Sequence, residues 1–438
     1  MLVPFQMSKL IIYVLCCPEI EAGLFYVKNM KDQPRTLKPM TLLACAAFAS
    51  VAAMRVCDSM LPEIAQDFET TNGRAASTIT AFAVSYGLFQ FIYGPLGDRY
   101  NKYRLISLAT FACTFGTLSA AVSPFLGWLI FSRAIAGATA AAIVPLSIAW
   151  IGDNVSYAER QATLARFLSG PILGLISGQF LGGFVADTFG WRWCFVLLAI
   201  IYVVIGALLH SEITHNKPIQ SQVVSEPSLT NMPAFLTQFA NVLRVKWARL
   251  ILVVVFLESL TVFGSVAFIP VHLHTSFGLS LTASGAIMSV FGLGGLSYTV
   301  IAGRLVTQIG ERGIVLTGGF LLGVAFLVFL LANRWAWAIP ASFATGMGFY
   351  MLHNTLQTNA TQMAPLARGT AVALFVAHFF LGQSVGVALG SAVIDRVGAL
   401  WLFAASAIVS PLIAAGFAFA LHYKKREYSR ASNIHNTD

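Results

Sequence analysis

The chain has 438 residues, of which 57% are hydrophobic and only 10% charged, and its formal net charge is +9. A soluble domain usually carries about 25% charged residues, so this composition and a mean hydropathy of +0.75 exclude a water-soluble fold. The apolar residues come in runs of about 20, a length that crosses a bilayer core. Because backbone groups in lipid must be satisfied within one segment, these runs predict helices.

Residues 1–40 precede the first long apolar run and are predicted to form an N-terminal tail. The apolar stretch 9–17 is too short to span a bilayer and lacks the cleavage site of a secretory signal. We expect natural translation to start at Met30, which N-terminal sequencing would test; a short interfacial anchor is the alternative. The six Cys show no CxxC spacing, so no metal, cofactor or disulfide framework is predicted.

We predict twelve membrane-spanning helices from the apolar runs. They lie near 41–62, 75–97, 104–123, 125–151, 164–186, 192–210, 248–270, 281–303, 313–332, 335–356, 367–391 and 398–421. The longest polar stretch, 211–247, reads as a flexible linker. The predicted domains are therefore six-helix bundles at 41–210 and 248–421, the linker 211–247 between them, and a tail at 422–438.

The basic residues predict the orientation of these helices. With both termini and the linker in the cytoplasm, 21 of the 27 Lys and Arg lie inside and only four lie outside. Such a bias favours this topology strongly. The basic charge is thus explained by topology, and no nucleic-acid partner is predicted.

An internal repeat relates the two predicted bundles. The segment GGFVADTFG (182–190) resembles GSAVIDRVG (390–398) at an offset of 208, and Gly94-Pro-Leu resembles Gly303-Arg-Leu at an offset of 209. An even number of helices per unit gives both halves the same orientation, which is the parallel repeat of rocking-bundle transporters. Chance recurrence of small residues in membrane helices is the alternative.

Intramembrane charges make helices 1 and 7 candidates for proton exchange. Arg55 and Asp58 lie three residues apart and share a helix face, while Glu258 lies well inside helix 7 with no partner nearby in sequence. Burial favours a neutral carboxyl and a nearby Arg favours a charged one, so switching environments would exchange a proton. We predict Asp58 and Glu258 as proton carriers; a static pair with Arg55 is the alternative for Asp58.

The loop after helix 2 reads GPLGDRYNKYR (94–104). Gly94 permits close helix approach, and Asp98 needs compensation from Arg99, Lys102 or Arg104, or from a helix N-terminus. The pattern resembles the signature loop of the major facilitator superfamily. That resemblance implies a conformational latch at the cytoplasmic ends of the two halves.

The loop differs from the family pattern at one position, its second copy differs at another, and one residue of helix 4 is added to the predicted latch. Asn101 stands where the family often has Gly, and Asn tolerates a left-handed backbone. The second copy has Thr307 in place of the Asp, so an asymmetric latch is expected. Asp153, at the cytoplasmic end of helix 4, is predicted to join the same network.

Helix 4 carries Arg133 inside its span, in LIFSRAIAGA (129–138). A buried Arg is costly in lipid, so it should face the bundle interior and have a partner. The segment resembles the family's helix 4 motif, whose Arg is associated with proton coupling. An architectural ion pair is the alternative.

Helix 5 carries glycines at every fourth position, which places them on one face and permits close helix packing. They are Gly170, Gly174, Gly178 and Gly182. The segment resembles the helix 5 motif of proton-driven antiporters, although that motif has Gly-Pro where this chain has Gly178-Gln179. Ordinary close packing is the alternative.

Polar side chains in helices 5, 10 and 11 are candidates for lining a substrate cavity. They are Gln179, His353, Asn354, Gln357 and His378. Hydrogen-bonded packing inside the bundle is the alternative for each. His272 and His274 make only a weak metal signal, and no metal site is predicted from them.

The block 351–375 resembles the arabinose-efflux-permease-like branch of the twelve-helix drug:proton antiporters, and the resemblance extends over about 40–421. It implies an all-α membrane protein with two pseudo-symmetric six-helix bundles. It also implies proton-coupled efflux of a small molecule (drug, sugar or metabolite) by a monomer in a bacterial cell membrane. A proton symporter importing a nutrient is the alternative. A membrane enzyme or sensor is disfavoured, because no nucleophile, base or metal cluster is evident.

Overall fold

The computed structural model describes residues 37–215, 232–364 and 367–435, and the regular structure within these ranges is entirely helical. The expected start at Met30 lies outside the described residues. The first half contains α3 (Leu37–Asp67), α4 (Asn72–Ala75), α5 (Ser77–Arg99), α6 (Lys102–Ala121), α7 (Leu126–Ala140), α8 (Ile143–Asn154), α9 (Tyr157–Phe189) and α10 (Trp191–His215). The second half contains α12 (Lys246–Val266), α13 (Ile269–Phe277), α14 (Leu281–Leu331), the 3₁₀ turn η3 (Trp335–Trp337), α15 (Ala338–Gln362), α16 (Arg368–Val397) and α17 (Ala399–His435).

These helices account for the twelve predicted spans, with local breaks that the apolar pattern did not show. Ten segments of the described chain are long and apolar enough to cross a membrane. One of them, α14, contains the expected helices 8 and 9, which meet at Gly310 with φ 65° and ψ 174°. The expected helix 10 is α15, whose polar side chains lower its hydropathy. Helices 4 and 7 are each divided in two, as α7 with α8 and as α12 with α13.

The linker prediction needs one correction. Residues 232–244 form a helix, α11 (Met232–Arg244), where the sequence suggested a flexible stretch. Its Phe239 ring lies edge-on to Phe91 of α5 at 5.3 Å, and Val242 is buried against the second half. Phe239 and Val242 are therefore covered by tertiary contacts, which stabilise helices that would be marginal alone. The segment 216–231 lies outside the described residues.

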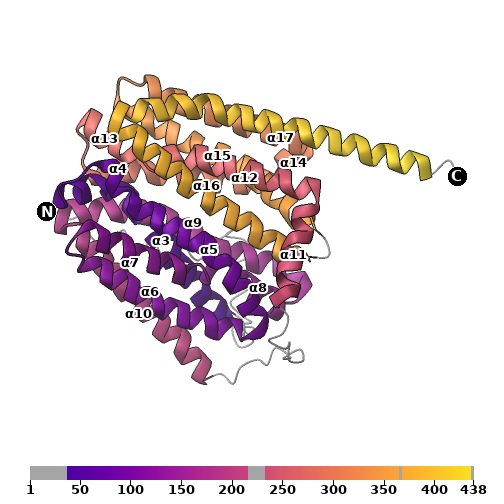
Figure 1. The fold of residues 1–438 in the computed structure, drawn as a ribbon, viewed down its shortest axis with the longest axis horizontal. Helices are drawn as coiled ribbons and strands as arrows, with labels where there is room; N and C mark the ends of the chain where they lie inside the picture. Colours follow the sequence, from indigo (N-terminus) through magenta and orange to yellow (C-terminus); the bar gives the residue numbers. More distant parts are fainter. Residues whose placement is uncertain (1–36, 216–231, 365–366, 436–438) are drawn as a thin grey trace, which may run out of the picture.

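The two halves lie side by side, as Figure 1 shows, with α4 and α13 at one end and α8 and α11 at the other. We call these the α4/α13 end and the α8/α11 end. Two helix pairs form the main contacts between the halves, α9 with α14 and α5 with α16. Each half also has its own apolar core cluster. In Figure 1, α17 runs on past the α8/α11 end toward the C-terminus.

The glycine face predicted in helix 5 packs against helix 1. A side chain at Gly170, Gly174, Gly178 or Gly182 would collide with a backbone carbonyl of α3, at Ala44, Phe48, Ala52 or Val56. In the second half, Gly382, Gly386 and Gly390 of α16 pack in the same way on α12, against Phe256, Leu260 and Gly264. Six of these seven glycines form three pairs 208 residues apart, so the repeat extends to backbone contacts. Gly382 and Gly386 were missed from the sequence, although the same offset would have found them.

Candidate functional site

The ion pair expected in helix 1 forms in the interior of the first half. Arg55 Nη1 lies 3.5 Å from Asp58 Oδ2, and both side chains are buried. Neither carboxylate oxygen of Asp58 accepts a hydrogen bond from the described residues. The contact is therefore an ion pair, and Gln179 interacts with the same carboxylate.

Arg133 reaches the same interior from α7. Its Nη1 donates to the carbonyl of Ala53 at 2.9 Å, and its guanidinium lies over the Phe82 ring, 4.4 Å from the centroid. Its Nε and Nη2 have no hydrogen-bond partner among the described residues. Arg133 interacts electrostatically with Asp58, so one buried carboxylate faces two buried guanidinium groups in the first half.

The second half holds a separate acid–base pair. Glu258 of α12 is buried, and its Oε2 lies 3.0 Å from Nδ1 of His353 on α15. Its other oxygen, Oε1, has no hydrogen-bond partner among the described residues. The sequence offered no partner for Glu258 because His353 is 95 residues away.

Aromatic rings enclose His353. The centroids of Phe349 and Phe379 each lie 4.9 Å from the imidazole centroid, and that of Phe375 lies at 5.4 Å. Such a shell covers most of the imidazole, of which 15% stays exposed, with flat apolar surfaces. The candidate site therefore combines one buried carboxylate with faces on which an aromatic or cationic group would pack.

One ring connects the charged groups of the two halves. Phe263 belongs to α12, and the Arg55 guanidinium of the first half lies over its face at 4.2 Å. The same ring makes edge contacts with Phe349 at 5.0 Å and with Phe379 at 5.5 Å, the two rings nearest to His353. Phe263 was not singled out from the sequence, because a Phe in an apolar helix carries no local signal.

The other predicted cavity residues divide into two groups. Gln179 is buried, interacts with Asp58, and has no hydrogen-bond partner at Oε1 among the described residues. His378 bonds within its own helix, from Nδ1 to the carbonyl of Leu374 at 2.8 Å. Asn354 is half-buried and Gln357 is exposed. The structure thus brings Gln179 and His353 to the two charged pairs. Among the described residues, no hydrogen bond or ion pair joins the other three side chains to either pair.

The segment 94–104 was expected to be a loop, but only Tyr100 and Asn101 lie outside α5 and α6. It contains one ion pair of the predicted latch. Lys102 Nζ lies 2.7 Å from Asp153 Oδ2, which joins α6 to α8 inside the first half. Gly94, Arg99 and Arg104 are exposed, and the side chain of Asp98 lies outside what the structure describes. The latch itself stays a prediction.

Asn101 in this loop requires a correction. Its backbone is not left-handed, since φ is −59°. Its side chain instead accepts a hydrogen bond from the Arg104 backbone N–H at 3.1 Å and caps the start of α6. Asn therefore serves here as an N-cap. Thr307, in the matching position of the second half, donates to the Arg304 carbonyl at 2.8 Å within its own helix.

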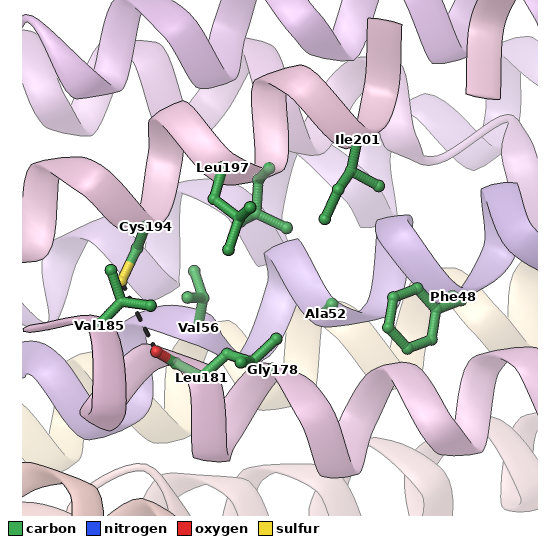
Figure 2. A pocket seen from close by; sticks show the side chains of 10 residues that line it. Phe48, Ala52, Val56, Gly178, Leu181, Val185, Cys194, Leu197 and Ile201 are labelled. Carbon is green, nitrogen blue, oxygen red and sulfur yellow. Dashed lines mark hydrogen bonds between the residues drawn. The ribbon is translucent and has the colours of Figure 1, made fainter. Parts of the chain in front are cut away.

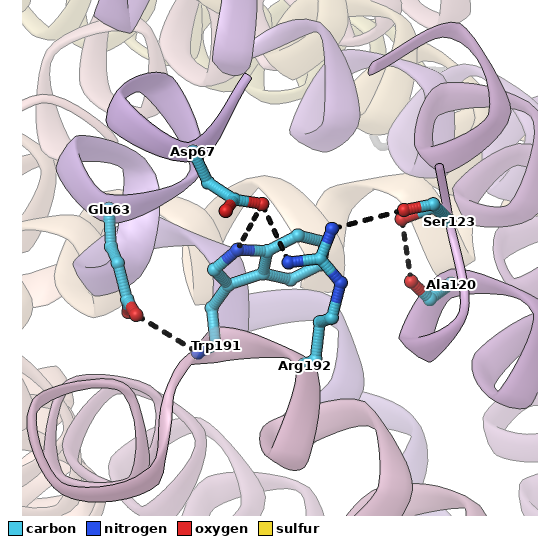
Figure 3. A network of polar contacts seen from close by, with 6 residues as sticks. All are labelled: Glu63, Asp67, Ala120, Ser123, Trp191 and Arg192. Atoms are coloured by element: carbon cyan, nitrogen blue, oxygen red, sulfur yellow. Dashed lines mark hydrogen bonds and ion pairs between the residues drawn. The ribbon is translucent and has the colours of Figure 1, made fainter. Parts of the chain in front are cut away.

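A polar network braces the first half at the α4/α13 end, as Figure 3 shows. Asp67 Oδ2 accepts from Arg192 Nη1 at 2.6 Å and from Trp191 Nε1 at 3.3 Å. Glu63 Oε1 accepts from the Trp191 backbone N–H at 3.3 Å, and Arg192 Nη2 donates to the Ser123 carbonyl at 3.2 Å. All these bonds stay within one half, so the network makes that half rigid and does not join it to the other.

A small crevice between α3, α9 and α10 is not a transport site. It measures about 20 Å³ and is lined by ten residues, which include Phe48, Leu181, Cys194 and Ile201. Figure 2 shows apolar side chains around it. A water molecule needs roughly 10–15 Å³ and also polar partners. The crevice has the volume for one water molecule but no polar lining, so it suits neither water nor a polar cargo.

The two histidines of α13 have local roles. His272 Nδ1 lies 3.1 Å from the Ser276 hydroxyl, and His274 Nδ1 lies 2.7 Å from the Leu279 carbonyl oxygen. Among the described residues, no three His, Cys, Asp or Glu side chains lie together in a way that could hold a metal ion.

Comparison with known proteins agrees with this architecture. A family profile described as Major Facilitator Superfamily matches residues 43–367 and 251–436. An MFS-type transporter of Bacillus subtilis, YwfA, is 24% identical over 397 residues, covering 87% of this chain and 91% of its own. The multi-drug resistance efflux pump PmrA of Streptococcus pneumoniae is 26% identical over 340 residues, covering 76% and 82%.

A shorter match and a solved structure complete the comparison. The multidrug export protein EmrB of Escherichia coli is 29% identical over 155 residues, covering 35% of this chain and 30% of its own. A POT family transporter crystallised with 5-aminolevulinic acid superimposes with a TM-score of 0.74 at 13% identity, covering 88% of this chain and 96% of that one. At that identity the likeness concerns the fold alone.

Proposed function

This chain belongs to the Major Facilitator Superfamily, and from that premise we propose that it exports a small molecule in exchange for protons by alternating access. One observation supports the proposal most. Each half contains a buried carboxylate beside a basic group, and the Arg55–Phe263 contact joins the two sites across the interface. The relatives named as efflux pumps support the direction of transport.

In the first half, we assign Asp58 as a proton carrier. The charged carboxylate compensates part of the charge on Arg55 and Arg133. When Asp58 binds a proton, two buried guanidinium groups lose their counter-charge, and an uncompensated buried charge is strongly unfavourable. Movement of Arg55 away from Phe263 toward water would relieve that cost, and this movement separates the halves at the interface.

In the second half, we assign Glu258 as the group for which proton and cargo compete. Its Oε2 is held by His353, while Oε1 has no partner among the described residues. A cargo that donates a hydrogen bond or carries positive charge would bind Oε1 when the carboxylate is charged, and a proton would displace it. Competition at one carboxylate produces exchange, in which cargo and proton travel in opposite directions.

The charge bias of the loops assigns the sides of the membrane in this proposal. Arg99, Lys102 and Arg104 lie at the α8/α11 end, as does the basic C-terminal segment, so we assign that end to the cytoplasm. The loop 94–104 is then our proposed cytoplasmic gate, with Gly94, Asp98 and the Lys102–Asp153 pair as its parts. We further propose bundles at 41–210 and 248–421, and a monomer in the bacterial cell membrane.

Transport in cells tests the proposal. With ethidium as the probe cargo, cells that express the protein should retain less dye than cells with an empty vector, and a protonophore should abolish the difference. A thermal-shift screen of the purified protein against drugs, sugars and metabolites would identify a natural cargo. Greater accumulation of that cargo in expressing cells would favour an importing symporter and contradict the assigned direction.

A further inference from the structure

At the α4/α13 end, the first half presents a carboxylate to the start of a helix in the second half. Asp187, near the end of α9, accepts from the backbone N–H of Leu281 at 3.2 Å and of Thr282 at 2.6 Å. Its Oδ2 also accepts from the Thr282 hydroxyl at 2.6 Å. These residues form the first turn of α14, where backbone N–H groups have no partner within the helix. The contact thus satisfies donors that would otherwise need water.

The second half presents a carboxylate to the first half in the same way. Asp395, near the end of α16, accepts from the Gly73 backbone N–H at 3.0 Å and from the Thr71 hydroxyl at 2.6 Å. Thr71 is the N-cap of α4, the turn that precedes α5. Both oxygens of Asp395 are used, as are both oxygens of Asp187.

The two contacts are related by the internal repeat. Asp187 and Asp395 are 208 residues apart, and the N-cap residues Thr71 and Ser280 are 209 apart. The backbones also meet at both places, because a side chain at Gly73 would collide with Asp395 and one at Gly183 would collide with the Leu281 carbonyl. Each contact therefore includes one glycine of the first half, Gly183 in one and Gly73 in the other, and this close backbone approach is a built feature of the fold.

We propose that Asp187 and Asp395 form a two-part clamp that holds the α4/α13 end closed, and that both contacts must break for that end to open. The proposal rests on the proposed alternating access and adds a gate distinct from the loop 94–104, which lies at the other end. Charge-assisted hydrogen bonds are stronger than neutral ones, so removing the two charges should favour the open form. The sequence marks both residues as repeat partners in opposite halves, but only the structure shows that each contacts the other half at the same end.

Substitution by Asn tests the clamp with little change in shape. An amide replaces one acceptor oxygen with an NH₂ donor, which faces the same N–H or O–H donors, so at least one bond is lost in each contact. Asp67→Asn is the matched control, because Asp67 lies at the same end but bonds only to Trp191 and Arg192 of its own half.

Opening can be measured without any cargo. Spin labels at Val122 and Leu331, which are exposed in different halves near this end, report the separation by double electron–electron resonance in nanodiscs. The Asp187→Asn/Asp395→Asn protein should show at least a tenfold rise in the ratio of long to short distances, each single variant a smaller rise, and the control none. An unchanged distribution in the double variant, or an equal change in the control, would overturn the clamp.

Milder variants keep the test decisive. If the double variant does not fold, the two single variants and Thr282→Val, which removes one hydroxyl donor to Asp187, must show the rise. Proton-driven dye export, measured separately, reports on the proposed function. Export is measured with the unmodified protein. If that protein exports dye but the double variant shows no distance change, the clamp alone is refuted. If the double variant opens but the unmodified protein does not export dye, the transport assignment alone is refuted.

Discussion

Replacing Glu258 by Gln should remove proton-driven export. The carboxylate is buried and lies 3.0 Å from His353 Nδ1. Gln has nearly the same shape and still accepts a hydrogen bond from the imidazole, so we expect the protein to fold and reach the membrane. It cannot exchange a proton, however, so the site stays in one state throughout the transport cycle.

The size of the effect follows from the proton's free energy. One proton moving down a gradient of one pH unit provides about 1.4 kcal/mol, equivalent to a tenfold gradient of cargo. With one proton exchanged at Glu258, export by the unmodified protein should change by up to about tenfold per pH unit. The Glu258→Gln protein should lose this dependence, and because its neutral amide resembles the protonated carboxyl it should also bind the cargo more weakly.

Proteoliposomes with an imposed pH gradient and ethidium inside measure both quantities. Glu212→Gln is the matched control, because Glu212 is also a buried carboxylate but pairs with Lys38 at 3.0 Å near the α8/α11 end. Asp58→Asn should lose proton-driven export as Glu258→Gln does, with expression unchanged. Normal gradient-driven export by both Glu258→Gln and Asp58→Asn would refute the assignment of the proton carriers.

Three further changes have expected outcomes. Phe263→Leu removes a cation–π contact worth about 0.5–2 kcal/mol and should weaken the pH dependence of export, which Phe263→Trp should preserve. Gly178→Ala places a methyl 2.6 Å from the Ala52 carbonyl oxygen. It should lower the free energy of unfolding by about 1–3 kcal/mol in a thermal melt. The control Gly416→Ala, which has open space around it, should leave the free energy of unfolding unchanged. Lys102→Gln breaks the partly exposed ion pair with Asp153 and should lower the free energy of unfolding by under about 1 kcal/mol. A larger loss would show that this ion pair stabilises the fold.

Contacts within one helix were predicted from the sequence, because helix geometry is the same everywhere. The Arg55–Asp58 spacing of three residues places both side chains on one face, and their ion pair is present. The glycine face of helix 5 was predicted for the same reason. Its partner helix was not, because close approach can be inferred from glycine spacing while the identity of the neighbour cannot.

Contacts between helices required the structure. Glu258 meets His353 across 95 residues, and Phe263 meets Arg55 across the interface of the halves. The rotation of each helix about its axis decides such contacts, and uniformly apolar spans carry little periodic signal to reveal it. The helix at 232–244 was missed because the contacts of Phe239 and Val242 are made with helices far away in the sequence.

The sequence by itself determined the membrane setting, the succession of helices and the duplication. Apolar runs in lipid leave the backbone no alternative to helices, and a repeat is visible in the residues themselves. The tertiary structure alone decided which charges are paired, which ring joins the halves, and that Asp187 and Asp395 each contact the opposite half at the α4/α13 end. These outcomes depend on how two rigid halves meet, and a surface formed by residues hundreds of positions apart leaves no local pattern in the chain.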